Sequence, residues 1–94
     1  MKVMVPTIHM NGSDPSVLLQ ESQEIWRNLY KAITAIRQAR PHDRDYYLQG
    51  EGVGALAREQ SLRQERMIQQ VIDEVVAVQY GITEQLLAKG YGGR

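Results

Sequence analysis

The feature that most constrains the fold is a pair of long apolar patterns with helical spacing, separated by a proline. The first pattern recurs at steps of seven, four, three, four and three residues, through Leu18, Ile25, Leu29, Ala32, Ile36 and Ala39. Pro41 ends this helix, because proline disfavours the α conformation in the preceding residue and has no amide donor. Asp14 before Pro15 predicts the start, since a carboxylate caps free backbone amides and proline suits the first turn. We predict a helix over residues 15–39.

A second helical pattern follows over residues 54–80. Its apolar positions repeat at three and four residues, through Ile68, Val71, Val75, Val78 and Ile82. Residues 57–66 carry mostly charged and amide side chains, so the apolar stripe fades towards the loop at residues 40–53. Gly81 leaves two alternatives open. It ends the helix as a left-handed cap, or the helix continues to Ala88 at a cost of roughly 1 kcal/mol.

Two long helices joined by one loop predict an all-α fold, a long antiparallel two-helix hairpin. Residues 1–13 lack helical spacing and are expected to form an extended N-terminal arm. The hairpin domain covers 14–89, and 90–94 form a flexible tail. A second stripe on the first helix makes its apolar face too wide for one partner helix, and two helices rarely close a core unaided. We therefore expect a homo-oligomer, with a partner face that contains Trp26, Tyr30 and Ile33.

Composition excludes several classes of function. The 94 residues include no Cys, which excludes disulfides, thiolate chemistry and the usual zinc sites, and only two His remain as metal ligands, so we expect no metal and no cofactor. Eleven basic and eleven acidic residues give a net charge of zero, which argues against nucleic acid and anionic lipid as partners. No apolar run approaches a membrane span, and the first dozen residues lack a secretion signal, so we expect a cytoplasmic protein.

The loop has more functional side chains than a helix connection needs. Within eight positions it combines guanidinium, imidazole, carboxylate and phenol groups, which recognise phosphates and stack on bases. Glycines at positions 50, 52 and 54 allow a ligand to approach the backbone closely. The candidate ligand-binding residues of the loop are Arg40, His42, Arg44, Tyr46 and Tyr47. Arg58 or Arg63 of another chain, and His9 and Asn11 of the arm, are the supporting candidates.

The same residues also have structural interpretations. Arg44 and Asp45 can pair with neighbours, and either loop tyrosine can close the end of the hairpin. Arg63 and Arg66 share a helix face with Glu59, which is typical of a solvated surface with a weak ion pair. The serines occupy helical or capping positions with no His beside them, so no nucleophile and base are paired and we expect no enzyme.

Two segments resemble a group of small proteins encoded by tailed bacteriophages. The arm sequence Thr7-Ile8-His9-Met10-Asn11-Gly12-Ser13 matches their His-x-Asn-Gly motif. The loop from Pro41 to Gly50 matches their Arg-Asp-Tyr-Tyr-x-Gln-Gly motif. The chain departs from the group in having His42-Asp43 before the arginine and Gln60 where a histidine is common. The resemblance implies a phage origin and a helical hairpin.

Together these features give two functional hypotheses. The first is a non-enzymatic, oligomeric phage protein of the host cytoplasm that sequesters a small anionic ligand, namely a nucleotide signal of a bacterial immune system. Its size and layout are similar to those of small helical hairpins that phages use in this way. The alternative is an interaction or scaffold protein that binds a host or virion protein through the apolar face around Trp26, Tyr30 and Ile33.

Overall fold

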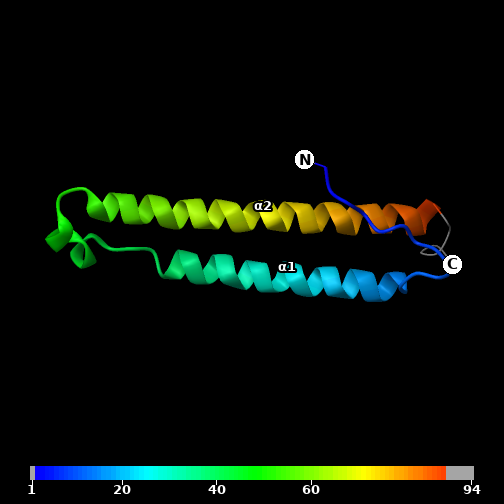
Figure 1. Cartoon of the computed structure of the whole chain (residues 1–94). Coiled ribbons are helices and arrows are strands. Elements are labelled where there is room, and N and C mark those ends of the chain that lie inside the picture. Colours follow the sequence, from blue (N-terminus) through cyan, green and yellow to red (C-terminus); the bar gives the residue numbers. More distant parts are fainter. Residues whose placement is uncertain (1, 89–94) are drawn as a thin grey trace.

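The fold is a hairpin of two long antiparallel helices with an arm lying against one of them (Figure 1). The computed structural model describes residues 2–88, and its principal extents are 62 × 22 × 21 Å. Helix α1 spans Pro15–Gln38 and helix α2 spans Val53–Ala88. Two short 3₁₀ turns, η1 (Asp43–Asp45) and η2 (Tyr47–Gln49), form the connection. Across residues 2–88 there is no β-strand, which confirms the predicted all-helical hairpin. The predicted flexible tail lies outside the described residues.

Helix α1 begins where its capping residues predict. Oδ1 of Asp14 accepts hydrogen bonds from the backbone amide and the hydroxyl of Ser16, both at 2.8 Å, and Pro15 occupies the first turn. The hydroxyl bond, followed by the amide bond, lowers the pKa of the Asp14 carboxyl. The helix ends at Gln38, one residue before the predicted end, and Ala39 acts as its C-cap. The predicted start is therefore confirmed, together with the capping mechanism.

Helix α2 passes through Gly81 without a break. Of the two alternatives that the sequence leaves open, the structure shows the continuous helix, which ends at Ala88 and not at residue 80. The glycine has a packing role, because a Cβ at this position would lie only 2.6 Å from Cγ1 of Val5 in the arm. Its missing side chain lets the arm approach the helix.

The arm is part of the hydrophobic core. Ile8 is 3% exposed, as deeply buried as the core isoleucines of the helices. Its amide donates to Oε1 of Gln85 at 2.9 Å, and Nε2 of Gln85 donates to the carbonyl of Pro6 at 2.7 Å. One glutamine side chain therefore holds the arm backbone from both sides, and the arm runs back along the C-terminal half of α2 (Figure 1).

The contact between the helices changes character along the molecule. From its centre towards the end far from the loop, α2 has Ile72 and Ile82 as buried positions, and Ile8 of the arm is buried too. The buried isoleucine of α1 is Ile33. In the half near the loop, the buried positions of α2 are Gly54 and Ser61, and Glu65 pairs with Arg40 further towards the centre. Apolar packing holds one half, and polar groups hold much of the other.

Candidate functional site

The loop forms a compact end cap with a small cup. Gly50 and Gly52 have φ angles of +129° and +83°, which L side chains rarely adopt, so glycine is required for the chain to enter α2 at this angle. The cup has a volume of about 340 Å³. Asp43, Tyr47 and Arg58 line it together with the glycine backbone, so two of the predicted ligand-binding side chains lie at one hollow.

Arg58 reaches the loop of its own chain. Nη1 of Arg58 lies 2.5 Å from Oδ1 of Asp43, in an ion pair whose two side chains are both substantially exposed. Gly54 makes the approach possible, because a Cβ there would lie 3.2 Å from Cα of Asp43 and would overlap its carboxylate. The sequence predicts that Arg58 meets the loop of another chain. The structure shows it bound within its own, because the start of α2 packs directly on η1.

Arg40, a predicted ligand-binding residue, faces the other helix and is already paired there. Nη1 donates to Oγ of Ser61 at 2.8 Å, and Nη2 donates to Oε2 of Glu65 at 2.7 Å. Nε of Arg37 donates to the other carboxylate oxygen of Glu65 at 2.6 Å. Arg40 follows α1 at a contact position, and its long side chain bridges the polar half of the hairpin. Ser61 and Glu65 are the partners that sequence analysis misses, although both lie at helical spacing from Ile68.

The Glu65 bridge makes stability depend on pH. The hydrogen bonds from Arg40 and then Arg37 lower the pKa of Glu65 in the folded chain. The stabilisation is therefore complete above the ordinary glutamate pKa of about 4.3, and it is lost as the pH falls through the lowered value. We expect Glu65→Gln to lower the melting temperature at neutral pH and to reduce its fall on acidification.

The measurement is the melting temperature followed by circular dichroism from about pH 7 to about pH 3. Glu59→Gln is the matched control, because Glu59 is an exposed residue of the same helix. It should leave the profile unchanged, and Asp14 supplies the acid sensitivity that remains in Glu65→Gln. Identical profiles for Glu65→Gln and the unmodified chain would contradict the prediction.

The remaining loop candidates point in different directions. Tyr47 is 68% exposed at the cup, and Arg44 and His42 are exposed on the same end cap. Tyr46 is half-buried in a separate hollow of about 290 Å³ between the ends of the two helices, where it closes the hairpin as its structural interpretation predicts. Among residues 2–88, Arg44 has no ion pair, which leaves its guanidinium available. The same holds for Arg63, an exposed residue of α2.

The arm motif lies at the opposite end of the molecule. The amide of Gly12 donates to the carbonyl of His9 at 3.1 Å, so the predicted motif forms a turn, and a Cβ at Gly12 would lie 2.9 Å from Nε2 of His9. His9 also lines a mainly apolar hollow of about 640 Å³ beside the start of α1. The chain is 62 Å long and joins its helices at the far end, so one chain does not bring His9 and Asn11 to the loop.

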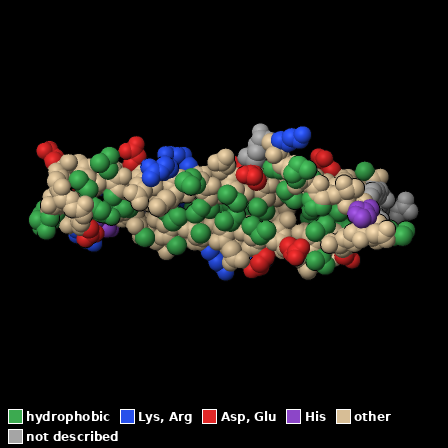
Figure 2. Space-filling model, viewed as in Figure 1, with side chains coloured by type: hydrophobic (Ala, Val, Ile, Leu, Met, Phe, Trp, Pro, Cys, Tyr) green, Lys and Arg blue, Asp and Glu red, His purple; other side chains and the backbone are tan. Residues whose placement is uncertain are grey.

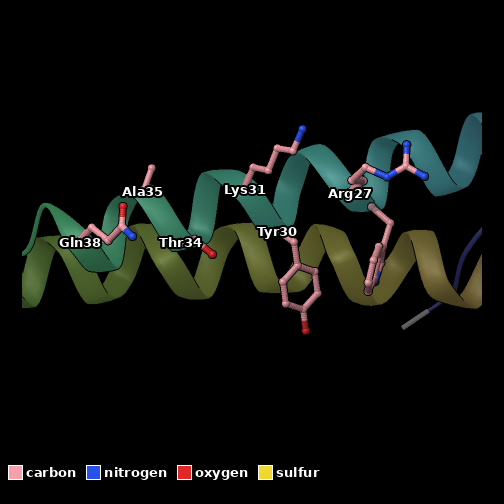
Figure 3. Close-up of a pocket in the computed structure, with 7 residues that line it drawn as sticks. Arg27, Tyr30, Lys31, Thr34, Ala35 and Gln38 are labelled. Carbon is pink, nitrogen blue, oxygen red and sulfur yellow. The ribbon is translucent and has the colours of Figure 1, made fainter.

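The predicted partner face is only partly exposed. Trp26 and Tyr30 are 39% and 43% exposed, and their rings contact each other at a centroid distance of 4.7 Å. Both line a groove of about 410 Å³ along α1, and Figure 3 shows Tyr30 on one side of it and the Lys31 amine on the other. Ile33 is 1% exposed, so its assignment to the partner face is wrong. Ile33 is therefore turned inward, whereas Trp26 and Tyr30 stay on the surface.

Comparisons with known proteins add no family assignment. No protein-family model, no curated protein and no solved structure matches the chain. Within the described residues, no group of three or more His, Cys, Asp or Glu side chains is arranged to hold a metal ion. No helix in that part of the chain is long and apolar enough to cross a membrane.

Proposed function

We propose that this protein is an oligomeric binding protein that sequesters a small anionic ligand at its loop end. The observation that carries the proposal is the end cap, where the exposed Tyr47 ring lines a cup with a glycine backbone. Arg44 is exposed in η1, directly after the cup residue Asp43, and has no ion pair among residues 2–88. A guanidinium binds phosphate oxygens in a bidentate way, and a phenol ring stacks on a base. This chemistry fits a nucleotide.

The charge around the cup sets the kind of anion that fits. Asp43 already neutralises Arg58, and Glu51 also lines the cup, so the charged residues of the cup leave a net negative charge. A free phosphate would therefore gain little there. A ligand with a base for Tyr47 and one or two phosphate charges for Arg44 fits better. The resemblance of the arm and loop motifs to phage proteins supports a role in infected bacterial cells, with a nucleotide immune signal as the ligand.

The proposed function is tested by a thermal-shift screen against cyclic and linear nucleotides. A ligand at 100 times its dissociation constant should stabilise the folded chain by about 2.7 kcal/mol, which raises the melting temperature of a small domain by several degrees. Arg44→Ala and Tyr47→Ala should each abolish the shift without changing the melting temperature of the free protein, because both side chains are exposed. Arg66→Ala, another exposed arginine, is the control and should keep the full shift.

A second candidate function rests on the groove beside Trp26 and Tyr30. Arg27 and Lys31 flank its aromatic floor, which fits an apolar segment with acidic residues from a host or virion protein. The same screen separates the two functions. The sequestration proposal fails if no nucleotide shifts the melting temperature and if Trp26→Ala, but not Arg44→Ala, removes the effect of the protein in infected cells. The function as an interaction protein then replaces it.

A further inference from the structure

One side of the hairpin carries an apolar surface that the arm only partly covers. Ile36 of α1 and its C-cap residue Ala39 line the same hollow as Ala57 and Gln64 of α2, which places these four residues on one side of the molecule. Steps of seven residues stay on one helix face, so Ala32 and Ile25 continue this side on α1, and Val71 continues it on α2. Ile25 and Val71 are 49% and 44% exposed. We call this surface the central face, and it comprises Ile25, Leu29, Ala32, Ile68, Val71 and Val75.

The central face lies midway along the molecule. The same seven-residue steps lead from Val71 through Val78 to Gln85, the residue that holds the arm, so the arm covers the far end of the same side. Figure 2 shows a band of hydrophobic side chains between the two helices, with charged side chains along its edges. The arm therefore leaves the middle of this side open.

The exposed area of this elongated chain is large enough for a second copy to cover the central face. The accessible surface is 7205 Å². A compact monomer of this mass exposes roughly 5,500 Å², so the chain exposes roughly 1,700 Å² more than it would as a globule. A stable interface buries roughly 800 Å² on each partner, which a second copy on the central face can supply.

The distribution of charge selects the orientation of the second copy. Between residues 28 and 72, which include the loop end, there are seven Lys or Arg and five Asp or Glu. In residues 2–27 and 73–88, which form the arm end, there are two against six. Within the described residues, the half that contains the loop is thus net positive, through its helices, and the arm half is net negative. The loop at 40–53 itself carries two Arg against three Asp or Glu, and Lys89 and Arg94 lie outside the described residues. An antiparallel copy places unlike halves together, whereas a parallel copy places like halves together.

We propose that a second copy of the chain packs antiparallel on the central face and that the loop end of each copy meets the arm end of the other. The resulting four-helix bundle gathers the cup, Arg44 and Tyr47 of one chain with His9 and Asn11 of its partner. Both chains then contribute residues to the ligand site. The assignment of a ligand to this site rests on the proposed function, whereas the packing of the two chains does not. This packing also explains why the arm motif with His9 and Asn11 and the loop motif with Arg44 and Tyr47 lie at opposite ends of one chain.

Cross-linking tests the packing without any ligand, because the chain contains no native cysteine. Asn11→Cys and Leu48→Cys both change exposed residues, one at each end. The two variants are unfolded together, refolded as a mixture and treated with a short bismaleimide. The mixture should give a covalent dimer that contains one copy of each variant, whereas each variant alone should give none. Self-linking of either variant, or a monomeric mass in solution, would overturn the inference.

A neighbouring pair of positions provides the matched control. Ala32→Cys lies near the two-fold axis and should link to itself, whereas Lys31→Cys lies on the side of α1 that faces the Trp26 groove and should not. Equal linking of both variants would contradict the assigned face. If the end-to-end link is absent but Arg44 still controls nucleotide stabilisation, the site lies within one chain, so the packing inference fails while the proposed function stands.

Discussion

Ile33→Ala is expected to lower the free energy of unfolding by about 2 to 5 kcal/mol, the cost of a cavity at a fully buried isoleucine. Ile33 is 1% exposed at the centre of the contact between α1 and α2, and few other apolar side chains of the hairpin are buried as completely. A small domain has little stability in reserve, so the melting temperature should fall by ten degrees or more. The measurement is urea unfolding followed by circular dichroism at 222 nm.

Two further variants keep this prediction testable if Ile33→Ala does not fold. Ile33→Val should cost only about 0.5 to 1.5 kcal/mol and should remain folded. Ile25→Ala removes the same atoms from a half-exposed position on the same helix, and in dilute protein it should cost clearly less than Ile33→Ala. Equal losses of unfolding free energy in Ile25→Ala and Ile33→Ala would show that Ile33 is not the inward residue.

Gly81→Ala is expected to release the arm from α2, although alanine stabilises a helix more than glycine does. Alanine gains roughly 1 kcal/mol over glycine inside a helix, yet its Cβ would lie 2.6 Å from Cγ1 and 2.8 Å from Cγ2 of Val5. These contacts are too short, so the arm has to move and the two hydrogen bonds of Gln85 to the arm are lost. Hydrogen exchange should show faster exchange of the Ile8 amide, with unchanged exchange at the centre of α2.

Shortening the arm side chain should reverse this effect. Val5→Ala removes both methyl groups that meet the new Cβ, so the double variant Val5→Ala, Gly81→Ala should recover much of the protection at Ile8. Val5→Ala alone controls for the loss of the valine. Faster exchange throughout α2 in Gly81→Ala would mean that the helix itself is disturbed, contrary to this explanation.

The sequence predicts the features that depend on local chemistry. The Asp14 cap, the helical spacing and the break at Pro41 act within a few residues, and the structure bears out each of them. The inward position of Ile33 depends on the other helix. Both stripes of α1 satisfy the helical period, and only the packing against α2 determines which of their residues are buried.

The candidate site is harder to predict because its contacts join distant segments. Arg40 meets Glu65 across 25 positions, and Gly81 meets Val5 across 76, so no local pattern indicates either contact. The sequence predicts that Arg58 meets the loop of another chain, because no local pattern shows that Gly54 lets Arg58 reach Asp43 within its own chain. One signal in the sequence does indicate Ser61 and Glu65. Both lie at helical spacing from Ile68, so extending the apolar stripe of α2 towards the loop passes through them.

The two halves of the hairpin should respond in opposite ways to salt. Near the loop, the Arg40–Glu65 and Arg58–Asp43 pairs are close enough to solvent for dissolved ions to screen them. Beyond the centre, Ile72, Ile82 and the arm depend on apolar burial, which sulfate strengthens by its exclusion from protein surfaces. In concentrated chloride the helices should separate first at the loop. In sulfate the loop end should gain the least stability. Comparing unfolding in chloride with unfolding in sulfate would therefore show from which end the hairpin opens.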